Sequence, residues 1–206
     1  MPSRCTHLGI DFDNTIVRYD GVFHRVAVER GCIPASVEVS KVAVRDWLRR
    51  AGQEDVWTEM QGHVYGARMR DAEMYPGVRE FLALAREAGM TLSIVSHKTR
   101  YPFLGGKHDL HAAARAWVDE FLRDEAGPYV PSERIHFETT KDLKWARIGA
   151  TGATHFVDDL PEILLAEAFP SGVERILFDP DHHHEALGTT VTTVHAWVEL
   201  RQQLLP

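Results

Sequence analysis

The sequence predicts an α/β protein with a mainly parallel sheet and a helical insertion after the first strand. Short apolar segments of strand length alternate with amphipathic segments of helical periodicity along most of the chain, and this alternation is typical of parallel α/β folds. Two of the apolar segments end in paired acids, Asp11 with Asp13 and Asp158 with Asp159. After the first pair, about fifty residues of helical pattern interrupt the alternation, which is more than the roughly dozen residues that a crossover connection needs.

Composition restricts the class of protein. The 206 residues are enough for one domain, or for one domain with an insertion. With 23 basic and 30 acidic residues the net charge is −7, and the basic residues are scattered. No nucleic-acid partner is therefore expected, because affinity for nucleic acid comes mainly from Lys and Arg. The two cysteines, Cys5 and Cys32, make neither a disulfide framework nor a zinc site. No apolar run resembles a signal peptide or a membrane span, which predicts a cytoplasmic protein with no membrane partner. The sequence leaves the oligomeric state open.

The first half of the chain is expected to hold one buried strand and the helical insertion. Residues 7–11 form the strand, and a loop follows as far as residue 20. Three helices come next: residues 23–30, ended by Gly31; a helix capped by Ser40 and ended by Gly52; and residues 54–67. We assign the insertion to residues 19–74 and interpret it as a small cap, so that residues 1–18 and 75–206 form the core domain.

The second half restores the alternation of strands and helices, with no internal repeat. The expected strands are residues 91–95, 135–137, 154–158, 175–178 and 191–194. The expected helices are residues 78–88, a helix from 110 that ends near 127, and residues 141–148, 161–168 and 197–205. Asp109 is a candidate cap for the helix at 110, and Thr139 or Thr140 for the helix at 141.

The two acid pairs are expected to meet at one edge of the sheet. In a strand, residues i and i+2 share a face, so Asp11 and Asp13 point the same way if the strand runs through both. If it ends between them, one side chain and one backbone carbonyl still converge. Each pair alone is typical of turns and caps, but the carboxyl ends of parallel strands meet in one crevice, where Asp158 and Asp159 also fall. Clustered carboxylates repel one another unless a proton or a cation separates them, and such an oxygen-rich site suits Mg²⁺.

A polar segment follows the mid-chain strand. Ser96 alone is typical of a capping residue, but a hydroxyl and backbone N–H groups at a strand end can also hold a phosphate oxygen. His97, Lys98 and Arg100 add further donors nearby, or form a solvated loop. We therefore treat Ser96 and His97 as candidate phosphate ligands.

A lysine near the start of the helix at 141 is the remaining candidate. Its ammonium would offset the clustered carboxylates and bind phosphate as a compact charge. Lys144 is preferred, because Ile148 lies four residues further on and its neighbours on the helix pack inward. Lys141 is the second choice, and an exposed helical lysine is the alternative interpretation of either.

Four motifs therefore stand in order along the chain: Asp11-Phe12-Asp13-Asn14-Thr15, then Ser96, then Lys144 or Lys141, then Asp158-Asp159. In this order they resemble the motifs of the haloacid dehalogenase (HAD) superfamily, over about residues 7–165. The resemblance implies a Rossmann-like, mainly parallel sheet with helices on both faces, and a small helical cap between the first two motifs. It also implies a mechanism that depends on Mg²⁺ and passes through an aspartyl-phosphate.

The resemblance also implies a role for each motif. Asp11 would be the nucleophile, and Asp13 would protonate the leaving oxygen and then activate water. Ser96 and the lysine would hold the phosphoryl oxygens. Mg²⁺ would be held by Asp11, the backbone carbonyl of Asp13 and one acid of the late pair. Asp159 is the first choice for that acid, and Asp158 is the second. The acid at Asp13 favours phosphoesters, because the dehalogenases of the superfamily lack it.

The expected function is hydrolysis of a phosphomonoester on a small metabolite, either a nucleotide or a sugar phosphate. A phosphomutase of the same superfamily is the first alternative, because it shares the nucleophile and the acid. A phospho-accepting signalling domain of the receiver type is the second. It is disfavoured because the mid-chain strand ends in Ser96 and the second acid pair comes late.

Overall fold

The chain folds as two compact units. The computed structural model describes residues 5–185 and 187–205. The first unit lies within Met1–Ile16, Met74–Lys98 and Leu122–Pro206, and the second contains Val17–Glu73 and Thr99–Phe121. The second unit thus holds most of the expected insertion together with residues 99–121, which the sequence analysis assigned to the core domain.

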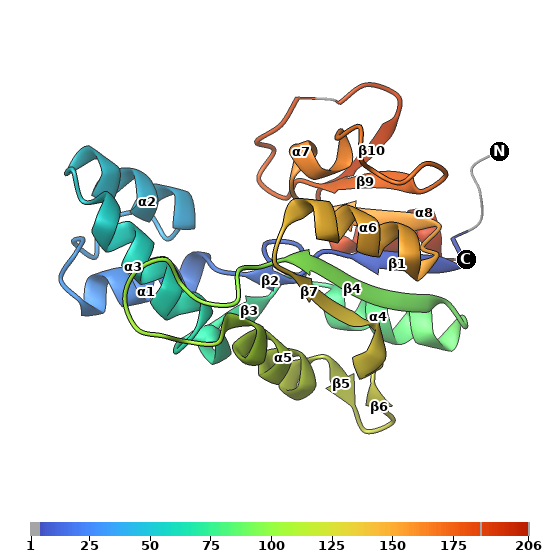
Figure 1. Ribbon diagram of the computed structural model, residues 1–206, viewed down its shortest axis with the longest axis horizontal. Coiled ribbons are helices and arrows are strands. Elements are labelled where there is room, and N and C mark those ends of the chain that lie inside the picture. Colours follow the sequence, from blue (N-terminus) through green and yellow to red (C-terminus); the bar gives the residue numbers. More distant parts are fainter. Residues whose placement is uncertain (1–4, 186, 206) are drawn as a thin grey trace. The chain divides into compact units, whose positions relative to one another are not determined.

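The first unit is built on a six-stranded sheet (Figure 1). Its strand order is β10-β9-β8-β1-β4-β7, and all five neighbouring pairs are parallel. The strands are β1 (His7–Ile10), β4 (Thr91–His97), β7 (Ile135–Glu138), β8 (His155–Asp158), β9 (Glu174–Phe178) and β10 (Val191–Val194). The predicted α/β class with a mainly parallel sheet is confirmed. Because β1 lies between β4 and β8, the carboxyl ends of these three strands come together.

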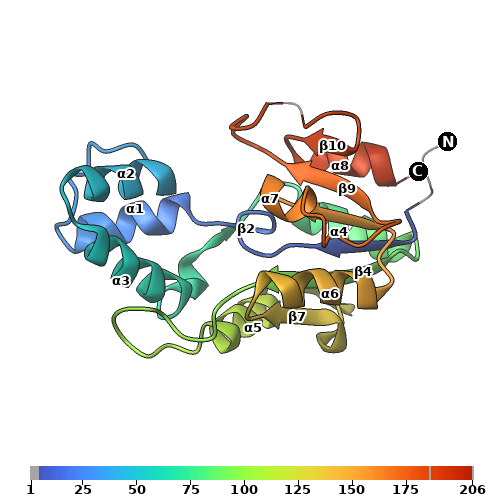
Figure 2. The ribbon, with the colours of Figure 1, turned by 45° about the horizontal axis from the view of Figure 1, so that its top comes forward.

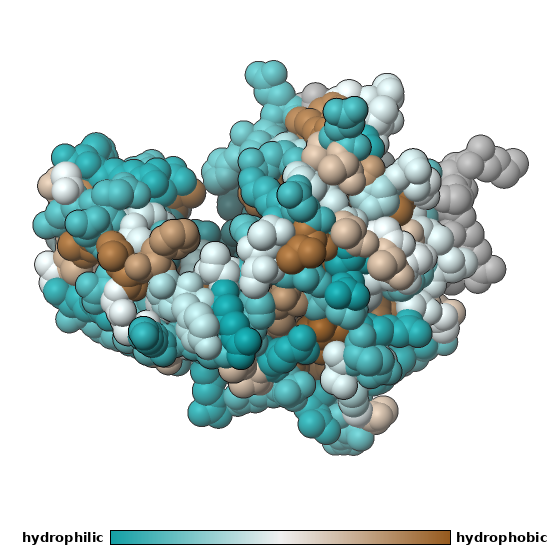
Figure 3. Space-filling view, viewed as in Figure 1, coloured by the Kyte–Doolittle hydropathy of each residue, from teal (hydrophilic) through white to brown (hydrophobic). Residues whose placement is uncertain are grey.

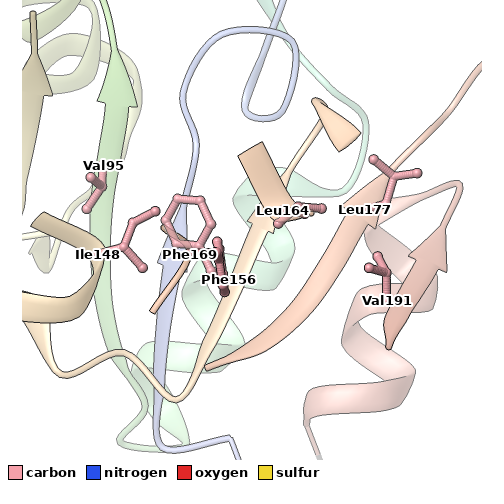
Figure 4. Packing of buried hydrophobic residues seen from close by; sticks show 7 residues of the cluster. All are labelled: Val95, Ile148, Phe156, Leu164, Phe169, Leu177 and Val191. Carbon is pink, nitrogen blue, oxygen red and sulfur yellow. The ribbon is translucent and has the colours of Figure 1, made fainter. Parts of the chain in front are cut away.

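Helices cover both faces of this sheet (Figures 1 and 2). They are α4 (Val78–Glu87), α6 (Lys141–Thr151), α7 (Pro161–Leu164) and α8 (Trp197–Leu204), with a short helix η2 (Ser132–Arg134) and a small hairpin of β5 (Arg123–Asp124) and β6 (Gly127–Pro128). On one face, Ile148 of α6 and Leu164 of α7 pack against Phe156 of β8 (Figure 4). The seven buried residues of this cluster are Val95, Ile148, Phe156, Leu164, Phe169, Leu177 and Val191. On the other face, Trp197 of α8 packs against Phe178 of β9, with ring centroids 6.1 Å apart.

Side-chain caps explain where two of the helices begin. The Ser40 hydroxyl accepts a hydrogen bond from the Ala43 N–H at the start of α2 (Lys41–Arg50), and Thr140 does the same for the Leu143 N–H at α6.

Helix α7 is shorter than the predicted 161–168. The chain leaves the helix after Leu164 and turns, which brings Phe169 into the core beside Phe156.

The second unit is helical. It contains α1 (Asp20–Glu29), α2, α3 (Glu54–Tyr65), the short helix η1 (Met69–Asp71) and α5 (Leu110–Phe121); β2 (Val17–Arg18) pairs with β3 (Glu73–Met74) where the chain passes between the units. The three helices expected in the insertion are present, and they contact one another. Helix α5 joins them because Trp117 is buried and its indole N–H donates to the Ala72 carbonyl, 3.0 Å away.

Within the part of the chain that the structure describes, every helix is too short or too polar to cross a membrane. The face drawn in Figure 3 is largely hydrophilic, with hydrophobic residues in scattered places.

Gly9, in the middle of β1, is required by close packing. A Cβ at this position would lie 2.6 Å from Cδ2 of Phe156, which is fully buried, and 3.4 Å from the Cβ of Ala153. We expect Gly9→Ala to lower the free energy of unfolding by about 1–3 kcal/mol, because overpacking forces a well-packed core to shift. Urea denaturation measures this. Gly21→Ala is the matched control: its Cβ would meet nothing within 4 Å, and alanine favours the helix in which it lies. Equal stability of Gly9→Ala and the wild type would contradict the packing argument.

Candidate active site

The first acid pair lies where β1 gives way to a turn. The strand ends at Ile10, and the Asp11 N–H still donates to the Val157 carbonyl of β8, at 2.9 Å. The backbone then turns, with Asn14 in the left-handed region at φ 58°, a conformation that asparagine tolerates better than most residues. Of the two geometries that the sequence leaves open, the structure has the strand ending before Asp13. Asp11 is 4% exposed, so its carboxylate lies inside the protein.

Lys144 lies between two of the acids. Its side chain is buried, and Nζ donates to Oδ1 of Asp11 at 2.6 Å and to Oδ2 of Asp158 at 2.5 Å. Helix α6 places it there, because the Thr140 cap fixes the helix start and Ile148 anchors the same side in the core. Lys141, the second choice from the sequence, instead pairs with Glu162, at 2.8 Å, on the exposed side of α6.

The charges of this cluster are strongly coupled. Burial raises the pKa of Asp11 above its usual value, and the nearby charges of Asp158 and Asp13 raise it further, whereas Lys144 opposes them. Burial disfavours the charged form of Lys144, but Asp11 and Asp158 outweigh it and raise its pKa. The lysine therefore stays an ammonium ion and holds together two carboxylates that would otherwise repel.

The second acid pair follows β8. Asp158 is fully buried: Oδ2 accepts from Lys144, and Oδ1 accepts from the Leu160 N–H at 3.0 Å. Asp159 is partly exposed. Asp11, Asp158 and Asp159 each offer a carboxylate oxygen, and these atoms lie within 4.8 Å of one another. Hard oxygen donors at this spacing fit a divalent cation such as Mg²⁺.

Ser96 and His97 lie at the end of β4, next to this cluster in the sheet. Ile10 of β1 pairs with Ile94, so Ser96 stands two residues further towards the carboxyl end, on the edge where Asp11 lies. Ser96 is 1% exposed and His97 is partly buried. Burial and the charge of Lys144 lower the pKa of His97, which favours the neutral imidazole.

The structure contains an ion pair between Lys98 and Asp13 that the sequence did not predict. The Lys98 Nζ lies 3.0 Å from Oδ1 and 2.7 Å from Oδ2 of Asp13, and the lysine side chain is 3% exposed. In the sequence, Lys98 stood only among several donors after Ser96. The one available signal was its position directly beyond a buried strand that neighbours the acid pair.

The turn after Asp13 also contains an unusual hydroxyl. Among the described residues, the Thr15 hydroxyl is the buried side-chain polar group with no hydrogen-bond partner. The Thr15 carbonyl accepts from the indole N–H of Trp197 at 3.0 Å, which fixes the turn to α8. An unsatisfied buried hydroxyl costs about 1–3 kcal/mol of stability.

Comparison with known proteins places this geometry in a fold family. No protein-family model and no curated protein matches the sequence. Many solved structures are similar to this chain, and the three described next are similar over nearly its whole length. The HAD-hydrolase YfnB from Bacillus subtilis, bound to magnesium, has 14% identity and a TM-score of 0.60, covering 99% of this chain and 100% of that one. Protein Tyrosine Kinase A from Mycobacterium tuberculosis has 17% identity and a TM-score of 0.63, covering 99% and 100%. A predicted phosphoglycolate phosphatase from Haemophilus somnus has 13% identity and a TM-score of 0.53, covering 98% of each chain.

Dehalogenases also share this architecture. At such low identity the similarity establishes the fold: the chain has the fold of the HAD-superfamily hydrolases, in agreement with the resemblance found in the sequence motifs.

Proposed function

We propose that the protein is a phosphomonoester hydrolase that depends on Mg²⁺, acts through an aspartyl-phosphate and uses a small phosphorylated metabolite, either a nucleotide or a sugar phosphate. One observation carries the proposal. Asp11 and Asp13 lie two residues apart at the end of the central strand, and each is held by its own buried lysine, Lys144 and Lys98 respectively. Such separation gives the two carboxylates different environments, which suits them to different roles.

The first role is that of a nucleophile. A carboxylate oxygen of Asp11 attacks phosphorus, the bond from phosphorus to the leaving oxygen breaks, and the phosphoryl group is carried on Asp11 as an acyl phosphate. Lys144 donates a hydrogen bond to Oδ1 of Asp11 and so holds this carboxylate in place. Because phosphoryl transfer depends on positioning and charge neutralisation, Ser96, His97 and Lys144 are the residues that we assign to the phosphoryl oxygens.

The second role is proton transfer. Asp13 gives a proton to the leaving oxygen as the alcohol departs, and then takes a proton from the water that attacks the acyl phosphate. That attack releases inorganic phosphate and restores Asp11. A carboxylate that serves both steps must stay within hydrogen-bond reach of the same position in space.

Mg²⁺ fits the donor set and would supply the positive charge that phosphoryl transfer needs. Asp11, the backbone carbonyl of Asp13 and Asp159 are the assigned ligands, with Asp158 as the second choice of the late pair. Each oxygen of Asp158 accepts a hydrogen bond from a protein donor, Lys144 at one and the Leu160 N–H at the other. The magnesium bound to the similar B. subtilis structure is consistent with this assignment.

Competing reactions are disfavoured on specific grounds. A dehalogenase has no use for a group that protonates a leaving oxygen, whereas Asp13 is present and oriented by Lys98. A phosphomutase would use the same residues but would return the phosphoryl group to its substrate, without net release of phosphate. The hydrolase is therefore distinguished by its product.

Release of inorganic phosphate tests the proposal. We expect turnover of p-nitrophenyl phosphate and of at least one member of a panel of sugar phosphates and nucleoside monophosphates in the presence of Mg²⁺. EDTA is expected to abolish turnover and added Mg²⁺ to restore it, because the clustered carboxylates need a cation to accept an anionic substrate. A cooperatively folding protein that releases no phosphate from any of these compounds would overturn the hydrolase assignment.

A further inference from the structure

The Lys98–Asp13 pair is distinct from the Lys144 cluster. Lys144 contacts Asp11 and Asp158, whereas Lys98 contacts both oxygens of Asp13. The backbone of Lys98 is itself fixed, because its N–H donates to the Glu138 carbonyl at 2.8 Å and so continues the pairing of β4 with β7. The ammonium therefore reaches Asp13 from a rigid strand end, although the two residues are 85 positions apart in the sequence.

Asp13 needs such a contact more than Asp11 does. It lies beyond the end of β1, directly before the turn that begins at Asn14, and its side chain is 20% exposed. A partly exposed aspartate can rotate about its side-chain bonds, whereas contact with one ammonium through both oxygens restricts that rotation. The Lys98 side chain is 3% exposed, and little water screens the pair. The geometry thus supplies a fixed orientation for this one carboxylate.

We propose that Lys98 is a positioning residue for Asp13, holding its carboxylate where it exchanges a proton with the leaving oxygen. The inference rests on the proposed function, and it assigns a role to a lysine outside the four motifs. Lys98 is not needed to explain the neutralisation of Asp11 and Asp158, because Lys144 already contacts both. Its contribution is therefore expected to depend on how much the reaction needs the proton.

The nature of the leaving group tests this role. p-Nitrophenolate is a stable anion and departs with little help from an acid, whereas the alkoxide of a sugar or alkyl phosphate requires a proton. We expect Lys98→Met to lower kcat for p-nitrophenyl phosphate by less than about 10-fold, and kcat for an alkyl phosphate by about 10²–10³-fold, the range that general acid catalysis and exact placement contribute. KM is expected to change little for either substrate.

Two further variants separate positioning from other causes. In an Asp13→Asn background, Lys98→Met is expected to cost no further activity on the alkyl phosphate, because the group that it positions can no longer transfer a proton. Arg201→Met is the control for loss of an ion pair. Arg201 pairs with Glu80 at 2.7 Å on the exposed face of α8, and we expect its substitution to leave both activities unchanged. If Lys98→Met does not fold cooperatively, Lys98→Gln undergoes the same comparison.

The outcomes are distinct. Equal loss of kcat on both substrates, no loss on either, or a loss that persists in the Asp13→Asn background would overturn the positioning role while leaving an active hydrolase. A wild-type protein that releases no phosphate from any substrate would overturn the proposed function, and the role of Lys98 with it. A loss of kcat that grows with the basicity of the leaving group, and that is absent in the Asp13→Asn background, would establish the positioning role of Lys98.

Discussion

Asp11→Asn is expected to abolish phosphate release while leaving the fold intact. An amide oxygen is a poor nucleophile, so we expect kcat to fall by at least about 10⁴-fold, as when an enzyme loses its nucleophile. The measurement is phosphate release with saturating Mg²⁺. A covalent phosphoryl group on Asp11, detected by mass spectrometry after rapid acid quench of the wild type, is expected to be absent from the variant. Retention of more than a tenth of the activity would show that Asp11 is not the nucleophile.

The same substitution has a second expected result, on stability. The pKa of Asp11 is raised by burial and then by the charges of Asp158 and Asp13, so the ionised carboxylate is less favourable in the folded chain than in the unfolded one. For an acid whose pKa is raised on folding, this cost is fully present above the folded pKa and disappears below the unfolded pKa. In EDTA at mildly alkaline pH, the Asp11→Asn protein is therefore expected to melt at the same temperature as the wild type or higher. A clearly lower Tm would mean that the contact with Lys144 outweighs the repulsion.

Lys144→Met is expected to lose both activity and stability. The substitution keeps the volume of the side chain but leaves Asp11 and Asp158 buried and close together with no cation between them. Removing one partner of a buried ion pair costs about 3–5 kcal/mol, because the remaining charge stays desolvated. Urea denaturation in EDTA measures that cost. We expect kcat for phosphate release to fall by about 10²–10³-fold as well, comparable to the loss of one donor to the developing charge.

The pH dependence of this variant provides a further check. Without the ammonium, repulsion and burial together raise the pKa of Asp11 further, so a proton bound at mildly acidic pH relieves the strain. Its deficit in stability is therefore expected to shrink as the pH falls from mildly alkaline to mildly acidic values. Arg201→Met again controls for loss of an exposed pair, which contributes at most about 1 kcal/mol. A deficit that is small and independent of pH would contradict the role of Lys144 in holding the acids together.

The features predicted from the sequence are those that local pattern determines. The alternation of strands and helices follows from hydrophobic periodicity. The caps are also local, because the Ser40 and Thr140 hydroxyls each accept a hydrogen bond from the backbone N–H three residues further along the chain. In the sequence, one helical neighbour, Ile148, favours Lys144 over Lys141. That spacing sufficed to choose the lysine that lies between Asp11 and Asp158, because the buried face of a helix repeats along the chain.

The features that the sequence did not yield depend on contacts between distant segments. The Lys98–Asp13 pair requires the register of β4 beside β1, which no local pattern specifies. The grouping of residues 99–121 with the insertion depends on tertiary contacts such as that of Trp117 with Ala72. Helix α7 ends early because Phe169 packs in the core. This tertiary contact overrides the helical pattern, which continues to residue 168 in the sequence.

The place of β1 in the sheet has a consequence for synthesis of the chain. Among the six strands of this sheet β1 is synthesised before the others, yet one of its two partners, β8, lies about 150 residues later and follows after roughly 7–30 s at ordinary elongation rates. Until then, one edge of β1 has no partner strand and can pair with other chains. The bond from the Asp11 N–H to the Val157 carbonyl closes this edge, and the same step brings Asp11 to Asp158. A chain interrupted before residue 155 therefore leaves this edge of β1 open and lacks the assembled acid cluster. Addition of β8 closes the edge and assembles the site in one event, before β9 and β10 extend the sheet.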